Sequence, residues 1–262
     1  MDLVTVTCDL DFNQMLLQAE SISKFVKPCT HWVIVNDQTI DKEKWEVALR
    51  PYYHNHTLKL LTPNWNNIPS DYGWAKQQAY KFIISKYLDD DYLLLDSKNF
   101  FIKSTDICEW HNIQGCGISE DLLSKGDKWM PTVQAYATKL NVAPSSTITC
   151  MQTPYVFKIA EIKKLGDIDL FAEWFLNQPV VPSEFIFYSH LINYKTDAHP
   201  KYKHVTLWPR YGEVTKKQLD NLNCNQDIKV IGLHRRYLEK LNFEQLNIIN
   251  CWLNELGLKN KF

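Results

Sequence analysis

In the first hundred residues, short apolar runs rich in β-branched residues alternate with segments of helical periodicity. The runs predict strands and the segments predict amphipathic helices. Because parallel strands need a long crossover between them, the alternation predicts a mostly parallel sheet with helices on both faces. The predicted strands are Leu3–Cys8, His31–Val35, Leu58–Leu61 and Asp91–Leu95, and the predicted helices are Phe12–Phe25, Lys42–Leu49 and Trp74–Tyr87.

Polar residues follow three of these strands, at Cys8-Asp9, Asn36-Asp37 and Asp96–Lys98. In parallel sheets ligands bind at the carboxyl ends of the strands. We therefore expect these three segments to be neighbours at a binding edge.

The second half of the chain is less regular. Its predicted strands are Thr147–Phe157, Val205–Trp208 and Ile228–Leu233, and its predicted helices are Ile159–Leu165, Leu170–Leu176, Ser183–Asn193 and one or two within Tyr237–Leu256. Since no repeat and no Gly/Ser linker divides the sequence, we expect one domain over 1–262 with two unequal halves.

Charge and cysteine content limit the classes of function. The net charge is −1 with a sequence pI near 6.7, which argues against partners such as nucleic acid that require overall positive charge. The 7 cysteines are scattered without a CxxC pair, so we expect buried free thiols in a reducing compartment. No signal peptide and no apolar run of membrane-spanning length is present, so the expected location is the cytoplasm.

The strongest candidate site is DYLLLDSKNFF, in which an apolar strand brings Asp96 to its carboxyl end, followed by Ser97 and Lys98. The preceding GWAKQQAYK segment is predicted to be helical. There Trp74, Gln77 or Gln78, and Lys81 share one face, which predicts a polar cleft on that side of the helix. The alternative is a solvated helix face with no ligand.

Two later segments are further candidates. In IKVIGLHRR a strand is followed by Gly232 and then by His234, Arg235 and Arg236. Histidine can be a metal ligand, and the two guanidinium groups suit phosphate. The alternative is that the arginines begin a solvated helix. In PSEF, Ser183 is a good N-cap and Glu184 falls in the first turn, where a carboxylate is favoured for structural reasons alone.

The segments GWAKQQAYKF and DYLLLDSKNFF resemble the Gly-Trp…Gln-Gln…Lys segment and the Asp-X-Asp strand of a poorly characterised bacterial and phage family of GT-A glycosyltransferases. TPYVF, PSEFIFYSHLINY and VIGLHRR resemble later segments of the family, so the resemblance covers most of the chain. The sequence also resembles glycosyltransferases of marine cyanobacterial phages, for which the location would be the host cytoplasm.

The resemblance implies an α/β GT-A fold, Rossmann-like, with a donor-binding half at about 1–105 and an acceptor-binding half at about 106–262. It implies a hexosyltransferase-like enzyme that uses a nucleotide-diphosphate donor, most often a UDP-sugar, and a hydroxyl acceptor whose identity the sequence does not reveal. The donor-binding residues would be Thr7, Asp37, Trp74, Gln77, Gln78, Lys81, Asp96, Ser97, Lys98, Arg235 and Arg236. Glu184 is the candidate base that deprotonates the acceptor, and Ser183, Tyr188 and Trp208 are candidate acceptor contacts.

One position departs from the family motif, since Lys98 stands where the last carboxylate is expected. The family would bind Mn²⁺ or Mg²⁺ there, and in this chain Asp96 and His234 are the candidate ligands. Two arrangements stay open: a metal that binds together with the nucleotide, which we expect, or a diphosphate neutralised by Lys98 and the arginines.

Two other classes of function are consistent with the sequence. The loss of the acidic pair could leave a nucleotide-sugar or glycan-binding module without activity. LLLDSKNFF also distantly resembles the strand of a haloacid-dehalogenase phosphotransferase that ends in an acidic nucleophile, although that strand usually comes first in the fold and carries a second Asp.

Overall fold

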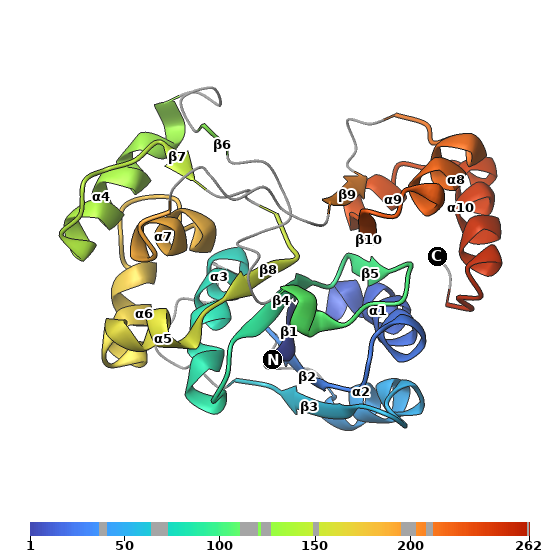
Figure 1. Ribbon diagram of the computed structural model, residues 1–262, viewed down its shortest axis with the longest axis horizontal. Coiled ribbons are helices and arrows are strands. Elements are labelled where there is room, and N and C mark those ends of the chain that lie inside the picture. The colour runs from blue at the N-terminus through green and yellow to red at the C-terminus, as the bar shows by residue number, and fades with distance from the viewer. Residues whose placement is uncertain are drawn as a thin grey trace.

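The computed structural model describes residues 1–36, 41–63, 73–110, 120–121, 127–148, 152–194, 203–207, 212–260 and 262. A five-stranded sheet forms its centre (Figure 1). In spatial order the strands are β3 (Thr57–Leu61), β2 (Thr30–Val35), β1 (Asp2–Thr7), β4 (Tyr92–Asp96) and β8 (Tyr155–Phe157). The first four are parallel, and β8 pairs antiparallel with β4. The protein is therefore α/β with a mostly parallel central sheet, as the sequence predicts.

The two innermost strands of this sheet are buried on both faces, and the residues Leu3, Val4, Leu93 and Leu94 of β1 and β4 are fully buried. Strands covered by helices on both sides read as continuous apolar runs, which accounts for LVTV and YLLL. The pairing sets Thr7 opposite Val35 and Val6 opposite Asp96, so the three strands end together at one edge.

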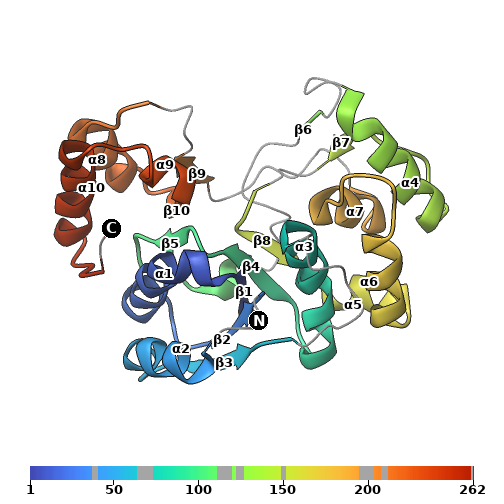
Figure 2. The same ribbon diagram turned by 180° about the vertical axis from the view of Figure 1, so that it is seen from behind.

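Helices from the first half of the chain flank this sheet. They are α1 (Phe12–Phe25), α2 (Lys42–Leu49) and α3 (Gly73–Ile83), the last continued by a 3₁₀ turn over Ile84–Tyr87. Asp41 caps α2 by accepting a hydrogen bond from the Lys44 amide at 3.0 Å. In the first two views α1 and α2 lie on one side of the sheet and α3 on the other (Figures 1 and 2).

The rest of the chain builds two further parts, one at each end of the molecule (Figures 1 and 2). One contains α4 (Met130–Leu140), α5 (Ile159–Ile162), α6 (Ile168–Leu176), α7 (Glu184–Leu191) and the short strands β6 (Glu120–Asp121) and β7 (Thr147–Ile148). The other contains α8 (Lys216–Cys224), α9 (Arg235–Leu238) and α10 (Phe243–Glu255) beside a three-stranded sheet. None of the described helices is long and apolar enough to cross a membrane.

The three-stranded sheet joins the two halves of the sequence. Its order is β5 (Asn99–Phe101), β10 (Ile228–Leu233) and β9 (Lys203–Leu207), with β10 antiparallel to β5 and parallel to β9. Since β5 follows β4 after a two-residue turn, the chain passes directly from the central sheet into the second one.

Most predicted elements are confirmed, with α1, α2 and β10 matching to the residue. The single strand predicted over Thr147–Phe157 is wrong: β7 and β8 are separate and belong to different sheets. The described cysteines are free, but the prediction that they are buried is wrong. Cys108, Cys224 and Cys251 are exposed, and Cys8 and Cys29 are half-buried.

Candidate active site

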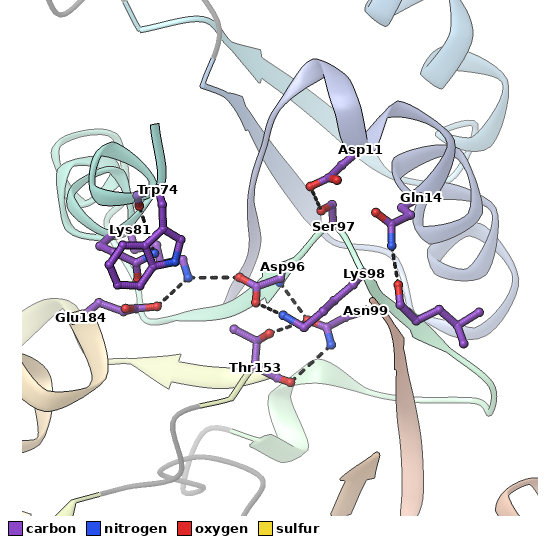
Figure 3. A network of polar contacts seen from close by, with 12 residues as sticks. Asp11, Gln14, Trp74, Lys81, Asp96, Ser97, Lys98, Asn99, Thr153 and Glu184 are labelled. Carbon is purple, nitrogen blue, oxygen red and sulfur yellow. Dashed lines mark hydrogen bonds and ion pairs between the residues drawn. The ribbon is translucent and has the colours of Figure 1, made fainter. Parts of the chain in front are cut away.

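The turn between β4 and β5 is held by hydrogen bonds to the buried side chain of Asn99. Asn99, which is fully buried, accepts a hydrogen bond from the Asp96 amide at 2.8 Å through Oδ1. Thr153 Oγ1 donates to the same oxygen at 2.6 Å, and the Gln18 amide donates to the carbonyls of Asp96 and Asn99 at 2.8 and 2.7 Å. With its backbone held on both sides, Asp96 projects its carboxylate from a rigid turn (Figure 3).

The Asp96 carboxylate lies between two ammonium groups. Lys81 Nζ, from α3, is 3.1 Å from Oδ1, and Lys98 Nζ donates to Oδ2. Lys81 also donates to Glu184 Oε1 at 2.6 Å, so it bridges a strand end to the first turn of α7 (Figure 3). The side chains of Lys81 and Glu184 are 5% and 3% exposed, which makes this a buried charge cluster rather than a surface ion pair.

The charges of the cluster shift its pKa values in different directions. Burial alone would raise the pKa of Asp96, but the ammonium groups of Lys81 and Lys98 outweigh burial and hold that pKa well below its usual range. Burial opposes the charge on Lys81, but Asp96 and Glu184 together raise its pKa. Burial raises the pKa of Glu184, because one ammonium group does not offset it. Glu184 is therefore the first group of this cluster to take up a proton on acidification.

The end of β10 adds a second group of polar residues to the same turn. The Leu233 amide donates to the Lys98 carbonyl at 2.9 Å, which brings His234 and Arg235 beside the turn. Arg235 Nε is 3.5 Å from Asp11 Oδ1, and Ser97 Oγ donates to the other oxygen of Asp11 at 2.9 Å. The segment after β10 is thus tied to the β4–β5 turn at both backbone and side-chain level.

His234 is the N-cap of α9, since its Nδ1 accepts a hydrogen bond from the Arg236 amide at 3.2 Å. Burial, together with the positive charges of Lys98 and Arg236, lowers the pKa of His234 to about 4, so the ring is neutral at pH 7. A backbone amide can only donate, so Nδ1 has no proton and the neutral ring carries its N–H on Nε2.

The structure brings some of the predicted site residues together and not others; Arg236, at the start of α9, is exposed. The structure brings Lys81, Asp96, Ser97, Lys98, Glu184, His234 and Arg235 to one place, as the contacts above show. Thr7 ends β1 at the same edge but is fully buried, with its hydroxyl donating to the Cys8 carbonyl at 3.4 Å. Asp37 and Trp208 lie outside the described residues.

The predicted polar face of α3 is only partly directed at this site. Lys81 joins the charge cluster, but the Gln78 amide donates back to the Trp74 carbonyl at 3.2 Å, and Gln77 is half-buried. Trp74 is 52% exposed and stands on the same side as Lys81 in Figure 3. Because Lys81 is paired and buried, the alternative of a solvated helix face is wrong at this position.

Two of the candidate acceptor residues, Ser183 and Tyr188, take structural positions. Ser183 caps α7 by accepting from the Ile186 amide at 3.4 Å, as predicted. Tyr188 is 1% exposed, stacks on Phe157 with ring centroids 4.3 Å apart, and its hydroxyl accepts from the Lys158 amide at 2.7 Å. Tyr188 is therefore part of the core, and this burial argues against an acceptor contact.

Sequence reasoning missed the residues that support the turn. Gln14 and Gln18 lie one helical turn apart on α1, and both side-chain amides bind backbone carbonyls at this edge, Gln14 that of Leu233. Two glutamines at i and i+4 on one side of an amphipathic helix are a sequence signal that could have identified them. No local signal pointed to Thr153, whose position depends on the tertiary fold.

The donor set does not fit a divalent cation. No group of three or more His, Cys, Asp and Glu side chains suited to a metal occurs within the described part of the chain. Both oxygens of Asp96 accept from ammonium groups, and the His234 nitrogen that lacks a proton is occupied by the Arg236 amide. A metal would have to displace Lys98 and reverse the tautomer of His234. The ligand pair predicted from sequence, Asp96 and His234, is thus not arranged as a metal site.

No protein-family model matches the sequence, and no curated protein matches it. Among solved structures, the galactosyltransferase LgtC in complex with donor and acceptor sugar analogues is similar over 98% of this chain and 95% of its own, with a TM-score of 0.51 and 12% identity. An active-site mutant of LgtC has a TM-score of 0.48 at 14% identity and the same coverage. The apo form of mouse xyloside xylosyltransferase 1 has a TM-score of 0.47 at 7% identity, over 88% of this chain and 97% of its own.

At such low identity the likeness to LgtC establishes the fold alone. The chain has the α/β fold of GT-A glycosyltransferases, in which a mostly parallel sheet is flanked by helices. Asp96 ends the fourth strand of the chain rather than the first, which argues against the haloacid-dehalogenase alternative.

Proposed function

We propose that this protein is a glycosyltransferase that moves a sugar from a nucleotide-diphosphate donor, of the UDP-sugar class, to a hydroxyl acceptor. The observation that carries the proposal is the charged cluster around Asp96 at the carboxyl edge of β1, β2 and β4 in a GT-A fold. Ligands of open α/β sheets bind at this edge. The comparisons support sugar transfer in general, and the choice of donor rests on the resemblance of the sequence.

In the proposed reaction the bond between the anomeric carbon and the diphosphate oxygen breaks, and its electron pair leaves with the nucleotide. A new bond forms between the anomeric carbon and the acceptor oxygen, whose proton passes to water. The charge that develops on the leaving diphosphate must be stabilised by groups already in position. Lys98, His234 and Arg235 surround the β4–β5 turn and are such groups.

Asp96 is assigned to the donor side of this site. Its pKa lies well below its usual range because the Lys81 and Lys98 ammonium groups outweigh the effect of burial. It is therefore a carboxylate at neutral pH, able to accept hydrogen bonds from ribose or sugar hydroxyls and to hold Lys98 in place. Its side chain is 27% exposed, so a ligand can reach it.

Glu184 was the candidate base, and the structure supports a different task for it. Its side chain is 3% exposed and its carboxylate is engaged by Lys81. In the proposal Glu184 is a positioning residue that holds Lys81 against Asp96, and it does not contact the acceptor. Ser183 and Tyr188 are likewise left out of the acceptor site.

The test is release of nucleotide diphosphate from a panel of UDP- and GDP-sugars by the full chain, since many transferases hydrolyse their donor slowly. We expect release from at least one UDP-sugar, and we expect Asp96→Asn to lower it by roughly 100-fold or more. Asp220→Asn, on the exposed face of α8, is the matched control and should retain the parental rate. Nucleotide binding without release would favour the binding-module alternative, and neither binding nor release would refute the proposal.

A further inference from the structure

The residue at the position of the missing carboxylate is itself part of the charge cluster. Lys98 follows Asp96 by two residues, and its ammonium group donates to Asp96 Oδ2. The side chains of Lys98 and Asp96 are 14% and 27% exposed, so this pair lies at the accessible side of the cluster, whereas Lys81 and Glu184 lie beneath it at 5% and 3%. The cluster therefore presents Lys98 where a GT-A enzyme would present its metal.

We propose that the protein binds its donor diphosphate without a metal ion, with the Lys98 ammonium group, His234 and Arg235 providing the positive charge and the N–H donors. This inference rests on the proposed function. The groups that bind the donor diphosphate belong to the same site as the charge cluster around Asp96.

The charge balance of the cluster is the first argument. Lys81 and Lys98 carry two positive charges, and Asp96 and Glu184 carry two negative charges, so the four side chains sum to zero. A carboxylate pair would leave a net negative site, which a divalent cation would neutralise. Here a cation would meet two ammonium groups that already bind both oxygens of Asp96, and Coulomb repulsion would oppose its entry.

The proton on His234 is the second argument. The Arg236 amide occupies Nδ1, so Nε2 bears the N–H and is a donor. A donor suits a phosphate oxygen and cannot coordinate a metal. The hydrogen bond from the Leu233 amide to the Lys98 carbonyl keeps the end of β10 against the β4–β5 turn, so His234 and Lys98 are held in fixed relation.

Arg235 is the third member of the anion-binding group. Its Nε lies 3.5 Å from Asp11, whose other oxygen is bound by Ser97 next to Lys98, and 3.7 Å from Glu239. The guanidinium group has five N–H donors, so an interaction through Nε leaves others for an anion. Asp11 therefore orients the guanidinium group beside the turn that carries Lys98.

The decisive measurement is calorimetric titration of UDP, and separately of GDP, into the full chain in EDTA and in Mn²⁺. We expect the affinity for the nucleotide that binds to be equal within about twofold in the two buffers. Tightening by tenfold or more in Mn²⁺ would overturn metal independence and leave the proposed function standing. If neither nucleotide binds and no sugar nucleotide is cleaved, the proposed function fails and this inference with it.

Variants at Lys98 test whether its ammonium group contributes to nucleotide binding. Lys98→Met should weaken nucleotide binding by roughly 10- to 100-fold in both buffers, since a charge-assisted hydrogen bond is lost. Lys98→Arg keeps the charge and should bind within about tenfold of the parent. Lys163→Met, at an exposed lysine, is the matched control and should change nothing.

Lys98→Asp is the sharpest variant, because it supplies a second carboxylate in place of the ammonium group. It should bind nucleotide weakly in EDTA and at least tenfold more tightly in Mn²⁺, so the metal would matter only in the variant. Parental affinity of folded Lys98→Met in EDTA, with circular dichroism as the check on folding, would contradict the role of Lys98.

Discussion

Lys81 is the residue on which the buried charges of the site depend. Among the described residues, the Glu184 carboxylate forms its ion pair with Lys81, which also neutralises Asp96. A buried ion pair contributes little against an apolar replacement of the whole pair, but removal of one partner leaves an uncompensated charge. In this cluster, loss of Lys81 would leave two carboxylates with the single ammonium group of Lys98.

We predict that Lys81→Met lowers the free energy of unfolding by about 3–5 kcal/mol at pH 7, measured by urea denaturation. Lys164→Met, on an exposed lysine, should change it by less than about 0.5 kcal/mol. A loss below about 1 kcal/mol for Lys81→Met would contradict the role given to the cluster.

The loss of stability in Lys81→Met should shrink on acidification, as the pH falls through the pKa values of Glu184 and Asp96. In the parent the pKa of Asp96 is lowered, so its contribution is present above the unfolded pKa and is lost on acidification. In the variant, Glu184 stays buried without Lys81, so its folded pKa rises further above the unfolded value, and the variant loses stability as pH rises and regains it on acidification. A deficit that grows toward low pH would contradict this assignment.

At the scale of elements, the contact between β10 and β9 depends on a residue without a side chain. Gly232 pairs with Thr206 across the two strands, and a Cβ atom added to Gly232 would lie 2.6 Å from Thr206 Oγ1 and 3.2 Å from Thr206 Cβ. These distances are shorter than van der Waals contact. The glycine therefore permits close packing of the strand that leads to His234.

We predict that Gly232→Ala lowers the free energy of unfolding by about 1–3 kcal/mol, because the added methyl overpacks the strand pair. Thr206→Ala removes Oγ1 and Cγ2, so the double variant should recover part of the loss, and a double-mutant cycle measures the coupling. Gly73→Ala is the control, since nothing lies within 4 Å of its added Cβ. Additive effects of the two substitutions would show that the steric explanation is wrong.

At the scale of the whole molecule, residues of the N-terminal half complete their packing only with the C-terminal half. Leu17, Phe100 and Ile102 share a buried cluster with residues from β9, β10, α8 and α10, and the rings of Phe100 and Trp252 meet edge to face at 6.2 Å. β8 likewise pairs with the edge of β4 that faces away from β1. The expectation of one domain stays a prediction, and this packing supports it.

A fragment of residues 1–105 should therefore lack a cooperative urea transition, because β4 and β5 would lose their partners β8 and β10. Mixing it with a fragment of residues 106–262 should restore part of the native circular dichroism. A sharp, reversible transition of 1–105 alone would show that the donor-binding half is an independent domain.

Much of the fold follows from local pattern. The limits of α1, α2 and β10 could be predicted because periodicity and β-branched content act over a few residues. The meeting of the β1, β2 and β4 ends follows from the rule for parallel strands. α4, α8 and β5 were not predicted. For α8 the capping box of Thr215 and Gln218 was a usable signal, whereas β5 has three residues and is defined by its pairing with β10.

The sequence by itself determined which polar residues would stand at the carboxyl edge of the sheet, because alternating strands and helices place strand ends together. Only the tertiary structure decided how those residues pair. Lys81 and Glu184 are 103 positions apart, and Lys98 binds Asp96 rather than turning to solvent. The energy of an ion pair in a low-dielectric interior depends on the distance between its two charges. Here that distance is set by the packing of helices and strands that are far apart in the sequence, and the local sequence pattern does not specify it.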